Sequence, residues 1–533
     1  MSLQQEVERR RSFAIISHPD AGKTTLTEKL LLFSGAIRIA GSVKARKASR
    51  HATSDWMEIE KQRGISVASS VMQMEYEGCI LNLLDTPGHQ DFSEDTYRVL
   101  TAVDAALMVI DAANGVEPQT LRLLQVCRAR NTPIITFINK LDREGRDPLD
   151  LVDEIERVLE MPVVPFTWPV GMGKSFAGVF DVRKDRMRLF RAGEDRVGGE
   201  EFVEGAAACT ERLGDKFAET HAQIELVCGA SAEFDKARFA AGEQTPVFFG
   251  SAINNFGVQE VLDALVTLAP HPRAREALER TVEPTEEKVS GVVFKVQANM
   301  DPAHRDRIAF VRLCSGKFDR GMRLVVTRTG KAVRTNTVVT FLSQRRELLE
   351  DAYAGDIIGI PNHGLLQLGD TLTEGESLRF TGLPFFAPEL FRMVEVADPL
   401  RTKQLHTGLT QLGEEGAIQV FRPLLGSALL LGAVGELQFE VVAHRLAHEY
   451  GAQARLMPAR YRFARWVTCR EAETLKRFID ANAHRIARDA ANEPTFLASL
   501  LAEITVAQEQ WPDIVFHTVR EHAGLVQQRA AAV

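Results

Sequence analysis

The segment from Ser17 to Thr24 constrains the fold of this chain more than any other. It reads Ser-His-Pro-Asp-Ala-Gly-Lys-Thr, follows an apolar run over residues 13–16 and precedes a helical pattern over residues 24–33. A strand-to-helix turn that ends in Gly-Lys-Thr directs backbone N–H groups and the positive end of the helix toward one point, where phosphate binds. The sequence therefore predicts a phosphate-binding βα unit at the start of a mostly parallel sheet.

Two side chains of this loop have chemistry that suits a nucleotide. Lys23 can reach the β- and γ-phosphates, and the Thr24 hydroxyl can bind Mg²⁺. The first position, which is usually glycine, is Ser17 here, so a polar strand-to-helix turn without a ligand is the alternative interpretation. The residues that we predict to bind nucleotide in this loop are Ser17, His18, Pro19, Asp20, Ala21, Gly22, Lys23 and Thr24.

A second motif, Asp-Thr-Pro-Gly-His, follows the apolar run over residues 81–84. The Asp85 carboxylate can act on Mg²⁺ directly or through water, and the Gly88 N–H can approach a γ-phosphate and detect its loss. A histidine beside such a phosphate sensor can orient the attacking water, so we predict that His89 is catalytic, although a lone histidine is more often structural. The predicted nucleotide-binding residues here are Asp85, Thr86, Pro87, Gly88 and His89, with Asp85 also a metal ligand.

A third motif, Asn-Lys-Leu-Asp, indicates which base is bound. It ends the predicted strand over residues 133–138, and the Asp142 carboxylate can accept hydrogen bonds from the ring N–H and the exocyclic amine of guanine. Adenine offers neither donor, so the motif favours GTP and GDP over ATP and argues against a P-loop kinase or ATPase. A turn cap is the alternative for these four residues. The predicted base-binding residues are Asn139, Lys140, Leu141, Asp142, Ser251 and Ala252.

The stretch between the first two motifs is polar and basic. Residues 38–50 include five Lys and Arg side chains and no acidic one, and the stretch leads to Arg-Gly-Ile-Ser at residues 63–66. We predict that the Ser66 hydroxyl binds Mg²⁺ when a γ-phosphate is present and releases it after hydrolysis. For the basic run, a phosphate or RNA contact and a solvated loop remain equal alternatives.

Composition limits the partners and the compartment. The chain has 64 Lys and Arg against 72 Asp and Glu, a formal charge of −8, so any nucleic acid must be bound by local basic patches. We expect no DNA partner. Its six cysteines form no Cys-x-x-Cys pair, which argues against a zinc site and against a disulfide framework. No apolar run is long enough for a membrane span, so we expect a cytoplasmic protein with no membrane partner.

The hydrophobic pattern divides the chain into three domains. Short apolar runs alternate with helical patterns over residues 1–280, as in a P-loop α/β domain with a mostly parallel sheet. Short β-branched runs over residues 281–383 predict a β-barrel. Residues 384–533 predict an α+β domain in which a ferredoxin-like unit closes with one strand over residues 454–467, followed by helices near residues 473–488.

The three motifs, together with the Arg-Gly-Ile-Ser string, resemble those of the translational GTPases related to elongation factor G. The strings at residues 17–20, 52–58 and 62–67 are similar to those of members that act in translation termination. The family usually has threonine at the position of Ser66. It usually has an aliphatic residue at the position of Pro19, which leaves open whether Pro19 and Ile65 form a gate for His89.

The resemblance implies a ribosome-stimulated, P-loop GTP hydrolase with GTP or GDP and Mg²⁺ as cofactors. It implies a monomer that binds the rRNA and proteins of the ribosome and promotes dissociation of class I release factors after peptide release. The alternative is another ribosome-associated GTPase of this family, of the translocase or ribosome-protection type. A carrier of the elongation factor Tu kind is a further alternative. Arginines and aromatic residues interleaved over residues 455–466 favour an rRNA-facing strand and a half-buried strand equally.

Overall fold

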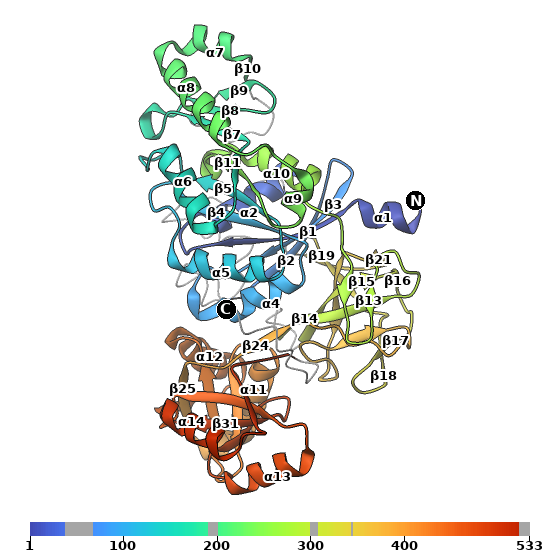
Figure 1. Ribbon diagram of the computed structural model, residues 1–533. Coiled ribbons are helices and arrows are strands. Elements are labelled where there is room, and N and C mark those ends of the chain that lie inside the picture. The colour runs from blue at the N-terminus through green and yellow to red at the C-terminus, as the bar shows by residue number, and fades with distance from the viewer. Residues whose placement is uncertain (38–67, 190–200, 299–306, 343–344, 522–533) are drawn as a thin grey trace.

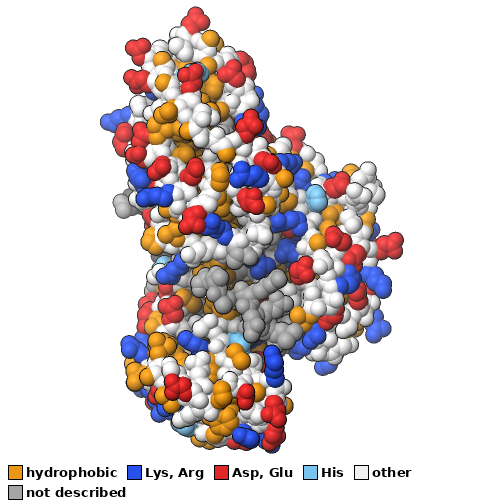
Figure 2. Space-filling view, in the orientation of Figure 1, with side chains coloured by type: hydrophobic (Ala, Val, Ile, Leu, Met, Phe, Trp, Pro, Cys, Tyr) orange, Lys and Arg blue, Asp and Glu red, His pale blue; other side chains and the backbone are white. Residues whose placement is uncertain are grey.

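The computed structural model describes residues 1–37, 68–189, 201–298, 307–342 and 345–521 (Figure 1). The predictions for Ser66, for the basic run 38–50 and for the contact between Pro19 and Ile65 therefore lie outside the described residues. Three domains follow one another along the chain, which we call the N-terminal, barrel and C-terminal domains. Figure 2 shows acidic and basic side chains interspersed on the visible face.

The N-terminal domain is a doubly wound α/β fold. Its sheet has the order β2-β3-β1-β4-β5-β11-β6, parallel except for β2, which pairs antiparallel to β3. The strands are β1 (Arg10–Ser17), β2 (Ser70–Tyr76), β3 (Cys79–Asp85), β4 (Ala105–Asp111), β5 (Ile134–Asn139), β6 (Val163–Pro165) and β11 (Thr245–Phe249). The central strands read as apolar runs because both faces of the sheet are covered. Consecutive β1 residues point into opposite cores, with Ala14 and Ile16 in one and Phe13 and Ile15 in the other.

Helices cover the two faces of this sheet. Helices α4 (Ser93–Thr101), α5 (Pro118–Ala129) and α6 (Pro148–Leu159) contribute to one core, and α2 (Lys23–Phe33) and α10 (Val258–Thr267) to the other. In a doubly wound sheet, loops at the carboxyl ends of the strands form the ligand site. All of the predicted nucleotide-binding loops lie at this edge.

A subdomain that the sequence analysis did not anticipate is inserted between β6 and β11. It contains a four-stranded antiparallel sheet of order β10-β9-β8-β7 and two helices, at the top of Figure 1. Its elements are β7 (Thr167–Val170), β8 (Gly178–Asp181), β9 (Arg186–Leu189), β10 (Phe202–Glu204), α7 (Ala206–Leu213) and α8 (Asp215–Ala230), and the short α9 (Lys236–Ala240) follows. Strands of three or four residues give too little alternation to be recognised.

The barrel domain is antiparallel and is joined to the N-terminal domain by buried ion pairs. Its main strands are β14 (Ser290–Ala298), β15 (Arg307–Ser315), β17 (Leu324–Val326), β18 (Lys331–Val333), β19 (Val339–Leu342), β20 (Arg345–Leu348), β22 (Ile357–Pro361) and β23 (Thr371–Thr373). Arg312 of β15 pairs with Asp104, which also lies 3.4 Å from Arg275. Burial alone would raise the pKa of Asp104, but Arg312 and Arg275 outweigh it and hold that pKa below its usual value. The two domains therefore share a buried, charged interface.

The first half of the C-terminal domain is the predicted ferredoxin-like unit. Its elements follow in the order β25 (Leu390–Val396), α11 (Thr402–Glu414), β26 (Gln419–Pro423), β27 (Leu430–Ala433), α12 (Glu436–Glu449) and β28 (Ala454–Pro458). The strand order is β28-β25-β27-β26, entirely antiparallel, which is the split β-α-β arrangement.

The second half repeats this arrangement, which corrects two expectations. Its elements are β29 (Phe463–Thr468), α13 (Ala472–Ala481), β30 (Ile486–Arg488), β31 (Pro494–Ala498), α14 (Leu501–Gln510) and β32 (Val515–His517), and β26 pairs with β30 to join the halves. The prediction of one strand over 454–467 was wrong, since this stretch forms two strands, β28 and β29. The break follows Pro458, which has no N–H to donate to a neighbouring strand. The helical prediction over 473–488 was correct only for α13, since Ile486 already lies in a strand.

The interleaved arginines and aromatic residues lie on both sides of this break. Trp466 is buried and its Nε1 donates a 3.0 Å hydrogen bond to Asp489, so its ring belongs to the core. Arg455, Arg460 and Arg462 are exposed. Trp466 is therefore not available for an rRNA contact, whereas these three arginines are, and Tyr461 and Phe463 are partly exposed. Strands β24 (Pro384–Phe386) and β33 (Val519–Glu521) pair beside the linker from the barrel. Within the described ranges no helix has the length and apolar character that crossing a membrane needs.

Candidate nucleotide site

The loop after β1 has the backbone geometry of a phosphate cradle. Gly22 is the N-cap of α2 with φ of +97°, in the left-handed region that favours glycine. A Cβ at this position would lie 2.3 Å from Nδ2 of Asn139. Asp20, which is exposed, also has a positive φ of 65°. The loop therefore requires glycine both for its conformation and for its close approach to the third motif.

Asn139 connects three of the predicted motifs. Its Nδ2 donates a 2.9 Å hydrogen bond to the carbonyl of Ala21, and its Oδ1 accepts one of 2.9 Å from the N–H of Ala252. Asn139 is 2% exposed, so these bonds are protected from water. One buried amide thus fixes the phosphate loop, the Asn-Lys-Leu-Asp turn and the Ser-Ala turn relative to one another.

The side chains predicted to bind the base lie together at the same edge. The Ser251 hydroxyl donates a 2.5 Å hydrogen bond to Oδ1 of Asp142, and Asn254 Nδ2 donates one of 3.0 Å to the same hydroxyl. Leu141 is fully buried and supports the turn. Lys140 has a φ of 73°, and its Nζ lies 2.7 Å from Oδ2 of Asp111.

Asp111 and Asn254 were missed by the sequence analysis. Asp111 carries a detectable signal, since it is a carboxylate directly after the apolar run of β4, at the same edge of the sheet. Asn254 carries none, because it lies in a short 3₁₀ turn and acts through a side chain three residues away.

The phosphate end of the site gathers Lys23 and the Asp-Thr-Pro-Gly turn. Lys23 donates to the carbonyl of Thr86 and lies 3.9 Å from Oδ1 of Asp85. A Cβ on Gly88 would lie 3.3 Å from the backbone of Pro19 and 3.6 Å from Lys23 Nζ. Gly88 is therefore close to the phosphate loop, as a γ-phosphate sensor must be.

Two histidines flank this end. His18 Nε2 lies 2.5 Å from the Glu117 carboxylate, which tethers the phosphate loop to the start of α5. His89 is 34% exposed, and its Nδ1 accepts a 3.2 Å hydrogen bond from the N–H of Asp91. The proton of a neutral His89 ring is then on Nε2. The backbone of Pro87 accepts from the Thr96 hydroxyl, which anchors the turn to α4.

The side-chain oxygens of Thr24 and Asp85 fit a Mg²⁺ ion whose other ligands come from a nucleotide and water. Thr24 is half-buried at the start of α2, and Asp85 is 2% exposed at the end of β3. A hydroxyl and a carboxylate are oxygen ligands of the kind that Mg²⁺ prefers, and it usually keeps waters and phosphate oxygens as further ligands. The described part of the chain holds no group of three or more His, Cys, Asp and Glu side chains able to hold a metal.

Comparison with protein families matches each domain to a translation factor. The model "Elongation factor Tu GTP binding domain" matches residues 8–271, and "Elongation factor G domain 2" matches residues 288–375. "Class II release factor RF3, C-terminal domain" matches residues 380–508. A crystal structure of a Thermus thermophilus protein has a TM-score of 0.69 at 25% identity, covering 86% of this chain and 69% of that one.

Curated relatives decide which branch is involved. The peptide chain release factor 3 of Nitrosomonas europaea is 74% identical over 534 residues, covering 99% of this chain and 100% of the relative. That of Bordetella pertussis is 72% identical over 530 residues, with 99% of each covered. The chain belongs to the peptide chain release factor 3 family. It is thus a guanine-nucleotide-binding translational GTPase of termination, which implies that it interacts with the ribosome. The translocase alternative is not favoured.

Proposed function

We propose that this member of the release factor 3 family binds GTP with Mg²⁺ at the edge described above and hydrolyses it on the ribosome. His89 is the proposed catalytic residue, and Thr24, Asp85 and Ser66 are the proposed Mg²⁺ ligands. The proposed domain limits are residues 1–280, 281–383 and 384–533. The proposed nucleotide-binding residues are Ser17, His18, Pro19, Asp20, Ala21, Gly22, Lys23, Thr24, Asp85, Thr86, Pro87, Gly88, His89, Asn139, Lys140, Leu141, Asp142, Ser251 and Ala252.

One observation carries this proposal most directly. The buried Asn139 amide binds the phosphate loop through Ala21 and the base-reading turn through Ala252. Motifs more than one hundred residues apart in sequence therefore form one site whose two ends suit a phosphate and a guanine. Proteins that bind nucleotides in doubly wound sheets do so at this edge.

The residues of the chain divide the chemistry among them. Lys23 and the N-terminus of α2 attract the phosphates, and Asp142 selects guanine by accepting from its N–H and amine. When bound by Thr24 and Asp85, Mg²⁺ would supply positive charge that offsets the negative charge of the phosphates. His89 orients the attacking water, and the Gly88 N–H responds to the presence of the γ-phosphate.

The proposed outcome of this switch is removal of class I release factors from the ribosome after peptide release. The GTP-bound form favours a ribosome conformation that binds the class I factor poorly, and hydrolysis then frees the GTPase. Membership in the release factor 3 family supports this role. We further propose that the protein is a cytoplasmic monomer whose partners are rRNA and ribosomal proteins, with no membrane and no DNA partner.

GTP hydrolysis measured with and without ribosomes tests this function. We expect ribosomes to raise kcat by at least about 100-fold, the scale of one completed set of catalytic groups. Excess GDP should compete with GTP, and excess ATP should not, because adenine leaves Asp142 unpaired. A rate that ribosomes leave unchanged, or equal competition by ATP, would contradict the proposal.

A further inference from the structure

Asp91 lies two residues after His89 and contacts both His89 and the C-terminal domain. It belongs to the 3₁₀ helix η1 (Gln90–Phe92), and its Oδ1 lies 3.3 Å from Nδ1 of His89. Its Oδ2 accepts a 2.8 Å hydrogen bond from the N–H of Leu437, near the start of α12. Asp91 is 6% exposed. A single buried residue therefore connects the proposed catalytic residue, through its backbone N–H, with a different domain, through its carboxylate.

The contact at α12 is a helix cap supplied from another domain. The N-cap residue of α12 is Gly435, which has no side chain to accept from the free N–H groups of the first turn. A Cβ on Gly435 would lie 2.0 Å from Cγ of Asp91, so the carboxylate occupies the space that a side chain would fill. Its negative charge also faces the positive end of the helix. Asp91 thus performs the function of the missing capping side chain.

The same short helix fixes the His89 imidazole. His89 is the N-cap of η1, and its Nδ1 accepts from the N–H of Asp91 at 3.2 Å. The orientation of the ring therefore depends on the position of η1. Because the middle residue of η1 is held by Leu437, the docking of α12 also restrains the ring.

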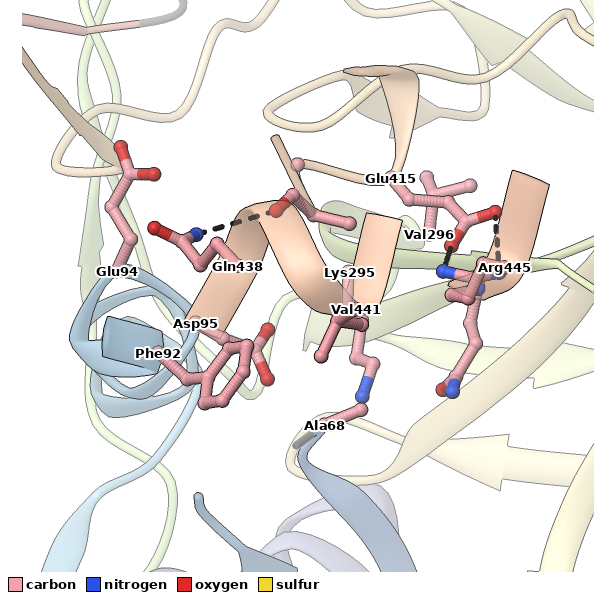
Figure 3. Close-up of a pocket in the computed structure, with 13 residues that line it drawn as sticks. Ala68, Phe92, Glu94, Asp95, Lys295, Val296, Glu415, Gln438, Val441 and Arg445 are labelled. Carbon is pink, nitrogen blue, oxygen red and sulfur yellow. Dashed lines mark hydrogen bonds and ion pairs between the residues drawn. The ribbon is translucent and has the colours of Figure 1, made fainter. Parts of the chain in front are cut away.

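Helix α4, which follows η1 directly, is docked on the C-terminal domain as well. Glu94 Oε1 accepts from the N–H of Phe386 at 3.1 Å and from Nε2 of Gln419 at 3.3 Å. Figure 3 shows Phe92, Glu94 and Asp95 beside a pocket that Gln438 and Val441 of α12 and Lys295 of the barrel also line. The segment after His89 is therefore restrained by both of the other domains.

We propose that Asp91 is a positioning residue that couples the docking of α12 to the activity of His89. While Asp91 caps α12, the imidazole stays bound to η1 and hydrolysis is slow. When binding to the ribosome draws α12 away from Asp91, η1 is released and His89 reaches the attacking water. The inference rests on the catalytic role proposed for His89 and adds the contact that controls it.

The substitution Gly435→Ala tests this coupling, because the added methyl group excludes the Asp91 carboxylate. We expect kcat for ribosome-free GTP hydrolysis to rise about three- to tenfold, because the loss of one helix cap shifts the equilibrium between docked and undocked α12 by about this factor. KM for GTP should not change. Asp91→Asn keeps the shape and one acceptor but removes the charge, so a smaller rise is expected. In each of these variants, a second substitution, His89→Ala, should abolish the rise.

Val442→Ala is the matched control. Val442 lies further along the same helix and is fully buried in the core of its own domain, so its truncation weakens the packing of α12 away from Gly435. A general weakening of α12 would accelerate hydrolysis equally in this variant, whereas the coupling predicts a wild-type rate. Unchanged ribosome-free kcat in both Gly435→Ala and Asp91→Asn would overturn the inference, as would an equal rise in Val442→Ala.

The two proposals can fail separately. If His89→Ala retains ribosome-stimulated hydrolysis, the catalytic role of His89 is wrong and the coupling loses its basis. If His89→Ala loses that hydrolysis while Gly435→Ala behaves as wild type, only the coupling is wrong. Unfolding monitored by circular dichroism identifies a variant that fails to fold, and Asp91→Asn then decides the result because it adds no atoms to the interface.

Discussion

Asp142→Asn is expected to weaken GTP binding by about 10²- to 10⁴-fold and to create binding of xanthosine triphosphate. The substitution removes the carboxylate and with it the two charge-assisted hydrogen bonds that we propose it accepts from guanine. Hydrogen bonds of this kind contribute about 1.5–3 kcal/mol each to binding. The asparagine amide can instead donate to the extra oxo group of xanthine. Equilibrium titration of both nucleotides with the wild type and the variant measures the change.

A matched control for this variant is Asp147→Asn. Asp147 is exposed, lies five residues further along and caps α6 through a 2.8 Å bond from the N–H of Leu149. Its substitution should leave both affinities unchanged. If Asp142→Asn bound GTP as tightly as the wild type and did not bind xanthosine triphosphate, the assignment of Asp142 as the base-reading residue would be wrong.

His89→Ala is expected to slow ribosome-stimulated GTP hydrolysis by about 100-fold or more while changing the Kd for GTP by less than about threefold. A positioned catalytic group contributes roughly this factor to kcat. The ring itself is bound to η1 rather than to the phosphate loop, so its loss should not disturb the other proposed nucleotide-binding residues. Single-turnover hydrolysis and nucleotide titration separate the two effects.

His221→Ala is the control for this loss of an imidazole. His221 is 34% exposed, as is His89, but it lies on α8 in the inserted subdomain. Wild-type kinetics are expected. A His89→Ala variant that loses binding and hydrolysis to the same extent would instead show that His89 is a structural residue of its loop.

The shared edge of the candidate nucleotide site could be predicted from the sequence because each motif is local. The Gly-Lys-Thr turn, Asp85 and the Asn-Lys-Leu-Asp turn each follow a buried strand, and parallel strands bring their carboxyl ends to one edge of the sheet. The prediction of a shared edge therefore required only the strand pattern. The buried bridge through Asn139 could not be predicted, because it depends on how three loops pack.

Features that depend on distant residues were missed. Strand β1 begins at Arg10 rather than at residue 13, because the Arg10 guanidinium is buried against Asp356 at a distance of 2.7 Å. From sequence alone, an arginine at this position predicts an exposed residue before the strand, because its buried partner in another domain is not known. The repeat within the C-terminal domain was missed for a related reason, since β30 and β32 have three residues each and pair only with distant strands.

The cap that Asp91 provides for α12 is the clearest case of this limit. In sequence, Gly435 lacks a capping side chain and Asp91 is one of many acidic residues. Their complementarity exists only after folding brings Asp91 to Leu437, which lies 346 positions further along the chain. Local patterns identify the parts of the switch, whereas its connection to another domain emerges from tertiary structure.

The departure of a labelled class I release factor from a post-release ribosome tests the central claim most directly. Adding this protein with GTP should accelerate departure, and Lys23→Ala should abolish the acceleration because the phosphates lose their ammonium partner. A non-hydrolysable GTP analogue should support one round of removal and leave the protein bound to the ribosome. A departure rate that is the same with and without the protein and GTP would contradict the account.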